Sequence, residues 1–277
     1  MRNRYPGTCT TCQVAVDVGA GIVIKENGRW RTYCAEHEPR PTPPARGDHQ
    51  GWHTTGLLGF DTETSSRDPD TAFLVSAALV DRDGKTRTWL VDPGPREIPA
   101  EAVAIHGIST ERARAEGRPA AECLEEIGQA LVDHLSAGQG LVIFNAPYDL
   151  RVLSGELERH GLPSLAERMG GPLAPVVDPL VLDRGVEPYR RGKRNLSAMC
   201  EYYGVPLIDA HTASADASAA LSLAQEIGAR HAELASLGLA ELHQRQVEWS
   251  LAFARSRQEW LDRSKPGHGT VVDGDWP

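Results

Sequence analysis

Three short acidic blocks constrain this chain more than any other feature, because their carboxylates must find compatible places in one fold. The blocks are Phe60–Thr64, which holds Asp61 and Glu63, then Phe144–Asp149, and finally His211–Asp216. Asp61 and Glu63 follow a buried apolar segment and are two residues apart, so on a strand both side chains point to the same face. Two carboxylates side by side repel each other unless a cation lies between them.

The other two blocks place an acid near the start of a predicted helix. Asp149 follows Asn145 and Pro147, which are typical of a helix start. On one continuous helix, the side chains of His211 and Asp216 would diverge by about 140°. We therefore expect His211 to precede the helix and Asp216 to lie in its first turn, so that both face one site.

Each block alone is explained as well by a polar strand end or a capped helix, since acids are favoured in a first helical turn. Jointly the blocks place four carboxylates at strand ends and helix starts, the edge of an α/β sheet where functional sites are built. Ligands that are all oxygen atoms select hard cations, so the pattern predicts Mg²⁺ or Mn²⁺ rather than zinc.

The segments between the blocks predict an α/β domain. Strands are expected at 57–60, 73–81, 86–91 and 141–144. Helices are expected at 119–135, 147–160, 195–203 and 213–231. A hairpin turn at Asp83-Gly84 and the later alternation of strands and helices indicate a mixed sheet flanked by helices.

The chain divides into five predicted parts. They are a cysteine-bearing module at 1–38, a Pro-rich linker at 39–54, the main domain at 55–231, a C-terminal helix at 232–263 and a tail at 264–277. The linker composition predicts a stiff extended segment, and we expect the tail to be loose. The C-terminal helix has heptad-like apolar spacing with two polar interruptions. Packing on the main domain is the favoured interpretation, and a docking or dimer surface is the alternative.

The N-terminal module has a metal-ligand pattern. Cys9-x-x-Cys12 and Cys34-x-x-His37 are separated by 21 residues, a spacing that resembles a zinc ribbon. Three thiolates and one imidazole suit tetrahedral zinc and leave no open position, so we predict one structural Zn²⁺. The purpose of the module stays open between nucleic-acid contact, a protein partner and support of folding.

The acidic blocks together resemble the DEDDh subgroup of DnaQ-like 3′–5′ exonucleases, the superfamily of proofreading subunits, RNase T and oligoribonuclease. The resemblance covers about residues 55–230. It includes Ile105–Ser109, similar to a substrate-side motif of the proofreading members, and also Val177–Leu180 and Asn195-Leu196. It implies an RNase H-like fold, with a five-stranded mixed sheet flanked by helices.

The resemblance also implies roles in catalysis. Asp61 would bridge two Mg²⁺ or Mn²⁺ ions, Glu63 and Asp216 would complete the shell of the first ion, and Asp149 would hold the second. His211 would act as general base, a task that suits a side chain titrating near neutrality. Together the two metals would clamp the attacking and leaving oxygens of the phosphodiester.

On the substrate side, the resemblance implies that Thr62, Thr64 and His106 contact the terminal nucleotide. The expected activity is release of nucleoside monophosphates from the 3′ end of DNA, preferably single-stranded, because a paired end must first fray. The alternatives are an RNA 3′–5′ exonuclease of the RNase T or oligoribonuclease type, and a non-catalytic adaptor that binds nucleic acid.

Charge and apolar content limit the partners and the location. The net charge of −9 counts mildly against a nucleic-acid binder, although it omits the charge of bound metals. The densest basic cluster would either contact phosphates or form a solvated loop; it consists of Arg184, Arg190, Arg191, Lys193 and Arg194. The apolar runs are too short to span a membrane and no signal region is seen, so we expect a cytoplasmic protein. A role in DNA replication or repair would need a protein partner, bound through the N-terminal module or the C-terminal helix.

Overall fold

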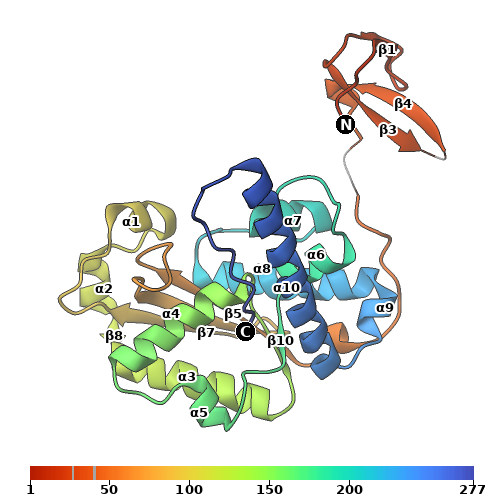
Figure 1. Cartoon of the computed structure of the whole chain (residues 1–277). Coiled ribbons are helices and arrows are strands. Elements are labelled where there is room, and N and C mark those ends of the chain that lie inside the picture. The colour runs from red at the N-terminus through yellow and green to blue at the C-terminus, as the bar shows by residue number, and fades with distance from the viewer. Residues whose placement is uncertain (27, 40–41) are drawn as a thin grey trace. The chain divides into compact units, whose positions relative to one another are not determined.

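The computed structural model describes residues 1–26, 28–39 and 42–277. They form two compact units, Met1–Thr42 and Pro43–Pro277 (Figure 1). Arg40 and Pro41 of the predicted linker lie outside the described residues.

The small unit consists of two short hairpins. β1 (Gly7–Thr8) pairs antiparallel with β2 (Ala15–Val16), β3 (Gly21–Glu26) pairs antiparallel with β4 (Arg29–Cys34), and the 3₁₀ turn η1 (Ala35–His37) follows. Its buried apolar side chains are Cys9, Val16, Ile22 and Tyr33. A core of this size buries too little surface to stabilise a unit of some forty residues, so a further source of stability is needed.

The large unit is built on a mixed sheet with the strand order β10-β9-β5-β6-β7-β8. The strands are β5 (Leu57–Thr64), β6 (Leu74–Asp81), β7 (Thr86–Asp92), β8 (Arg118–Pro119), β9 (Gly140–Val142) and β10 (Val176–Val177). β6 is antiparallel to both β5 and β7, whereas the pairs β5·β9, β9·β10 and β7·β8 are parallel. The predicted mixed α/β sheet is confirmed, but its expected number of five strands is wrong, because the two-residue strand β8 adds an edge.

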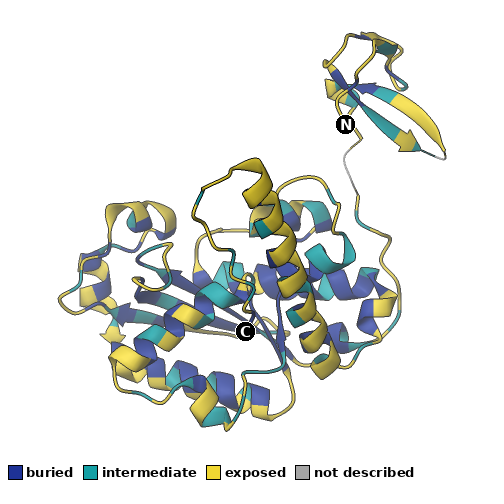
Figure 2. Cartoon of the chain, viewed as in Figure 1, coloured by how far each residue is buried: buried dark blue, intermediate teal, exposed yellow. Residues whose placement is uncertain are grey.

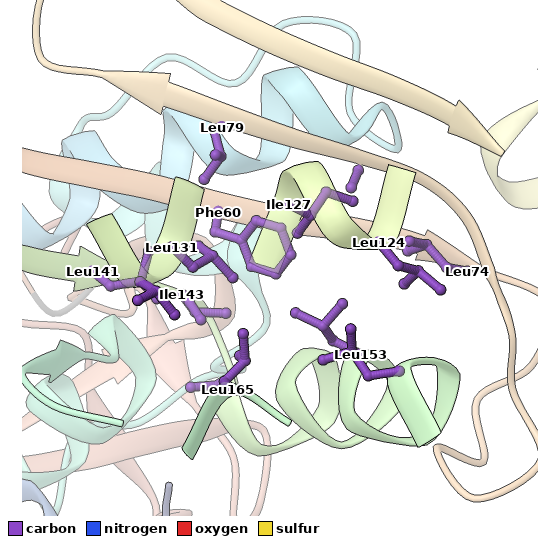
Figure 3. Packing of buried hydrophobic residues seen from close by; sticks show 14 of the residues in the cluster. Phe60, Leu74, Leu79, Leu124, Ile127, Leu131, Leu141, Ile143, Leu153 and Leu165 are labelled. Atoms are coloured by element: carbon purple, nitrogen blue, oxygen red, sulfur yellow. The ribbon is translucent and has the colours of Figure 1, made fainter. Parts of the chain in front are cut away.

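Helices cover both faces of this sheet (Figures 1 and 2). The helices are α1 (Ala100–His106), α2 (Thr110–Glu116), α3 (Ala120–Ser136), α4 (Ala146–Arg159), α5 (Leu165–Met169), α6 (Pro179–Val186), α7 (Leu196–Tyr203), α8 (Ala213–Arg230), α9 (Ala232–Ala235) and α10 (Leu239–Ser264). On one face, Phe60 packs among side chains of α3 and α4 such as Ile127 and Leu153 (Figure 3). On the other face, Leu57 packs against α7 and α8.

The linker between the two units is shorter than the predicted residues 39–54. Trp52, in the 3₁₀ turn η2 (Trp52–Thr54), is 3% exposed, and its indole N–H donates to the carbonyl of Leu234 at 3.0 Å. The backbone N–H of Gly47 donates to the carbonyl of Ala229 at 2.8 Å. Residues 47–54 therefore belong to the large unit. Burial of a large aromatic side chain such as that of Trp52 is strongly stabilising, and an extended linker would leave it exposed.

The C-terminal helix packs on the sheet edge, and the tail returns to the same place. On α10, the Gln246 side chain accepts the Asp178 N–H at 2.7 Å and donates to the Val176 carbonyl at 3.0 Å. The expectation of a loose tail is wrong, because Trp276 is 6% exposed and donates its indole N–H to Asp178 at 3.3 Å. None of the described helices combines the length and apolar character needed to cross a bilayer.

Candidate active site

The predicted acidic cluster forms where α8 crosses β5. On β5, Gly59 faces α8, and a Cβ at this position would lie 2.5 Å from the carbonyl oxygen of Ala217. Only glycine permits this close approach. Because side chains alternate along a strand, Asp61 and Glu63 point to the same face as Gly59.

Three of the four predicted acids converge. Asp216 lies in the first turn of α8, whose N-cap Thr212 accepts the Ala215 N–H at 3.3 Å. Carboxylate oxygens of Asp61, Glu63 and Asp216 lie within 4.8 Å of one another. The structure thus brings the first and third sequence blocks together, as predicted.

Asp149 joins the site from α4. It lies in the first turn of this helix and is 4% exposed. One of its carboxylate oxygens, Oδ1, accepts both the backbone N–H of Thr62 at 3.1 Å and the hydroxyl of Thr62 at 2.6 Å. Asp149 is therefore tied to β5 between Asp61 and Glu63, although it lies outside the tightest group of three.

The acids perturb one another strongly. Burial and the charges of Asp149, Asp216 and Glu63 raise the pKa of Asp61 well above its usual range. Burial and the nearby acids raise the pKa of Glu63 to about 7. Burial raises the pKa of Asp149 to about 7 in spite of its bonds to Thr62, and burial also raises the pKa of Asp216.

This donor set fits divalent cations. Oε1 of Glu63 is buried and has no hydrogen-bond partner among the described residues. A buried, unpartnered carboxylate oxygen is costly, and two or more carboxylates in one place are stabilised by a cation between them. The ligand atoms are all oxygens, which suits Mg²⁺ or Mn²⁺.

His211 lies at the rim of the cluster. It directly precedes the N-cap of α8, as predicted, and its backbone is left-handed with φ of 71°. Its backbone N–H donates to Oδ1 of Asp216 at 3.4 Å, and its side chain is exposed. The ring is therefore not one of the converging ligand atoms, but its backbone is fixed beside them.

A cavity of about 1010 Å³ adjoins the acids and contains the three predicted substrate contacts. His106 ends α1, and its Nδ1 accepts the Ile108 N–H at 3.1 Å, so the proton is on Nε2. This Nε2 is buried and has no hydrogen-bond partner among the described residues. His106 lines the cavity, where burial lowers its pKa and a hydrogen bond with the Thr64 backbone opposes that shift.

The two threonines differ from the expectation. The hydroxyl of Thr62 is used by Asp149, and the hydroxyl of Thr64 bonds to Tyr148 and to the carbonyl of Ser66. Neither hydroxyl is free, although both residues line the cavity. The sequence analysis missed Tyr148 and Asn145 as lining residues, although both belong to the second acidic block.

Two residues of the predicted basic cluster are paired inside the protein, whereas Arg191 and Lys193 are exposed. Arg190 is 4% exposed in its side chain and contacts Asp183 at 2.8 Å, and Arg194 contacts the same carboxylate at 3.2 Å. Tyr203 donates its hydroxyl to Asp183 at 3.0 Å. These two arginines neutralise a buried acid, so the structure does not support phosphate contact for them.

The N-terminal unit has a separate cluster. Donor atoms of Cys9, Cys12, Cys34 and His37 lie within 4.8 Å of one another. Sγ of Cys34 lies 3.8 Å from Sγ of Cys12 and 3.2 Å from Nδ1 of His37. Burial raises the pKa of Cys9, but backbone N–H groups of neighbouring residues outweigh it and lower that pKa to about 6. A stabilised thiolate beside two further thiols and an imidazole fits zinc.

Comparison with known proteins decides the family. The Exonuclease (RNase_T) family model matches residues 58–224, more than half of the 277 residues. The chain belongs to this exonuclease family. The predicted resemblance to DnaQ-like exonucleases is thereby confirmed.

Individual relatives match part of this chain. The DNA polymerase III subunit epsilon of Rickettsia conorii is 31% identical over 155 residues, which are 53% of this chain and 61% of that protein. An uncharacterized exonuclease of Escherichia phage 186 is 32% identical over 111 residues, or 40% of this chain and 54% of that one. The chain thus spans about three fifths or less of the length of these relatives.

The fold is similar to that of exonuclease I. The E. coli enzyme in complex with a dA16 oligonucleotide aligns with a TM-score of 0.58 and 18% identity, over 72% of this chain and 45% of that chain. The enzyme from Methylocaldum szegediense aligns with a TM-score of 0.55 and 22% identity, over 74% of this chain and 45% of that chain. At this identity the similarity concerns the fold.

Proposed function

We propose that the protein is a metal-dependent 3′–5′ exonuclease that releases nucleoside monophosphates from DNA, preferably single-stranded. The observation that carries the proposal is the meeting of Asp61, Glu63, Asp149 and Asp216 beside a large cavity. This arrangement also argues against a non-catalytic adaptor, which has no use for four mutually repelling carboxylates. The names of the relatives support DNA as substrate, since one is a DNA polymerase subunit and others are exonuclease I with oligonucleotides.

The four acids would hold two Mg²⁺ or Mn²⁺ ions. Asp61 would be the shared ligand, Glu63 and Asp216 would complete the first site, and Asp149 would serve the second. When bound, two such ions stabilise the attacking and leaving oxygens of an in-line displacement. The raised pKa values of Glu63 and Asp149 mean that protons and metal compete for these carboxylates near neutral pH.

The remaining residues would move a proton and orient the substrate. His211 lies at the solvent side of the cluster, where it would take the proton of the attacking water and release it to solvent. His106 lines the cavity that would hold the terminal nucleotide. Asn145 and Tyr148 line the same cavity as His106, so they would lie beside the terminal nucleotide.

The decisive experiment is time-resolved digestion of a 5′-labelled DNA strand with Mg²⁺ or Mn²⁺. We expect a descending ladder that is blocked by a 3′-phosphate and slower on a duplex. Asp61→Asn should abolish the ladder, while Asp209→Asn, an exposed acid outside the cluster, should not. Cleavage of a circular strand would show an endonuclease and contradict the proposal. Faster digestion of RNA than of DNA would show that the protein is an RNA exonuclease instead.

In the N-terminal unit, we propose one structural Zn²⁺ held by Cys9, Cys12, Cys34 and His37. The support is the convergence of the four donor atoms and the small apolar core of that unit. A closed four-ligand site contributes directly to folding in such small units.

A further inference from the structure

A second cavity continues the catalytic one. It has a volume of about 290 Å³ and shares Asn145 and Tyr148 with the cavity beside the acids. Its other walls come from α4, α6, α10 and the C-terminal tail. A strand whose 3′ end occupied the first cavity would therefore have a path into the second.

Two arginines of this second cavity differ in their pairing. Arg151, on α4, contacts Asp70 at 2.6 Å and Asp273 of the tail at 4.0 Å. The Arg184 guanidinium lies over the Phe253 ring, 3.9 Å from its centre, and has no ion pair or hydrogen bond with any described residue. Burial lowers the pKa of Arg184. The charges of Asp178, which also lines this cavity, and of Asp183 oppose that shift, but neither acid forms a direct ion pair with Arg184 among the described residues. A partly dehydrated cation without a direct ion pair attracts an anion.

The tail brings two acids to these arginines. After α10 the chain turns back across the large unit, and its last residues reach the region of α4 and β10 (Figure 1). Trp276 anchors this return through its bond to Asp178 and its ring contact with His243, 5.1 Å between centres. Just before the anchor, Asp273 and Asp275 line the same cavity as Arg184.

We propose that this cavity binds a backbone phosphate of the strand behind the terminal nucleotide, and that Asp273 and Asp275 compete with that phosphate. The proposal rests on the proposed exonuclease function and adds a subsite and a competitor to it. The phosphate would pair with Arg184, and the tail acids would occupy or repel the same position. Short substrates that end in the catalytic cavity would not meet the tail.

The first test measures binding of a fluorescent single-stranded 12-mer to full-length protein in an Asp61→Asn background, which prevents cleavage. The double variant Asp273→Asn/Asp275→Asn should bind several-fold more tightly at low salt, and the gain should shrink as salt screens the charges. Asparagine keeps the side-chain oxygen with which Asp273 accepts the Asp275 N–H at 2.9 Å. The matched control is Glu241→Gln/Glu259→Gln, the same charge change at exposed positions of α10.

The second test identifies the phosphate site. In the double-Asn protein, Arg184→Gln should reduce the slope of log K against log salt by about 0.7, the effect of one phosphate contact in a single strand. Arg255→Gln, at an exposed position of α10, should leave the slope unchanged. No gain in the double-Asn variant over its control, or an unchanged slope in Arg184→Gln, would overturn the proposal and leave the tail acids as mere neutralisers of the arginines.

A mononucleotide substrate separates this inference from the proposed function. The 4-nitrophenyl ester of thymidine 5′-monophosphate carries no phosphate besides the one that is cleaved, so it would occupy only the catalytic cavity. Its hydrolysis by protein with intact Asp61 should be the same with and without the two Asp→Asn changes. If unmodified protein hydrolyses neither this ester nor DNA, the exonuclease proposal fails, whereas a faster ester reaction in the double-Asn variant would contradict the tail inference alone.

Discussion

The carboxylate of Asp149 on α4 is bound twice by Thr62 on β5, through the backbone N–H at 3.1 Å and the hydroxyl at 2.6 Å. These two bonds stabilise the ionised form and lower a pKa that burial raises. They join the helix that carries the fourth acid to the strand that carries the first two. Thr62, predicted as a substrate contact, is thus a residue that positions and ionises a proposed metal ligand.

Replacing Thr62 by valine should therefore act through Asp149. A hydrogen bond to a charged group is worth about 1.5–3 kcal/mol, so losing the hydroxyl should raise the Asp149 pKa by about one unit or more. We expect the acidic limb of the pH profile of kcat/KM to move to higher pH, and Mn²⁺ affinity at pH 7 to fall. Thr62→Ser keeps the hydroxyl and should resemble the unmodified protein. Identical profiles for the valine and serine variants would contradict this role.

The four acids should also make the metal-free protein sensitive to pH. Glu63 has its pKa raised from 4.5 to about 7, so its ionisation opposes folding. Its stabilising contribution is present below pH 4.5 and is lost as pH rises through about 7. We expect the free energy of unfolding in EDTA to fall across this range, and added Mg²⁺ to restore it above pH 7.

Asp61→Asn removes a buried charge from this group. In EDTA at pH 8 it should stabilise the protein by on the order of 1–3 kcal/mol, with little effect at pH 5. It should also remove the stabilisation by Mg²⁺, as measured by thermal unfolding. Asp209→Asn provides the control. A destabilised Asp61→Asn protein at pH 8 in EDTA would contradict the repulsion between the acids.

Much of the fold and the acidic cluster could be predicted because the signals are local. Apolar strands, helix starts and the two-residue spacing of Asp61 and Glu63 all lie within short segments. The close approach of α8 to β5 depends on Gly59. A glycine in an apolar strand indicates that another segment packs closely against it, but the sequence does not show which segment this is.

The rest depends on contacts between distant segments. Trp276 is one aromatic residue in a polar tail and has no periodicity that predicts burial, yet its partner Asp178 lies 98 residues away. Likewise, the sequence shows Arg190 and Arg194 as a basic cluster but does not show that both neutralise Asp183. Such pairings decide which charges remain available to a substrate, and they become visible only in the structure.

His211→Gln tests the proposed general base. The side chain is exposed and is not among the converging ligand atoms, so metal affinity should persist. Turnover should fall by about 10²–10⁴, the usual contribution of a positioned acid–base group. Single-turnover digestion and Mn²⁺ titration measure the two effects separately. His160→Gln, an exposed histidine at the end of α4, is the matched control, and unchanged turnover in His211→Gln would remove this residue from the mechanism.

Cys34→Ser tests whether the N-terminal unit needs its metal. Removing one thiolate from a closed four-ligand site should lose about one zinc per chain and unfold this unit, whose apolar core is small. The large unit has its own core, so cleavage of short substrates should persist. Metal analysis, limited proteolysis within residues 1–42 and digestion assays distinguish the effects.

Cys123→Ala is the control, because it removes a thiol from the large unit and should keep the zinc. Wild-type protein purified without chelators and found free of zinc would refute the zinc site, whereas loss of short-substrate cleavage in Cys34→Ser would show that the small unit supports the catalytic one.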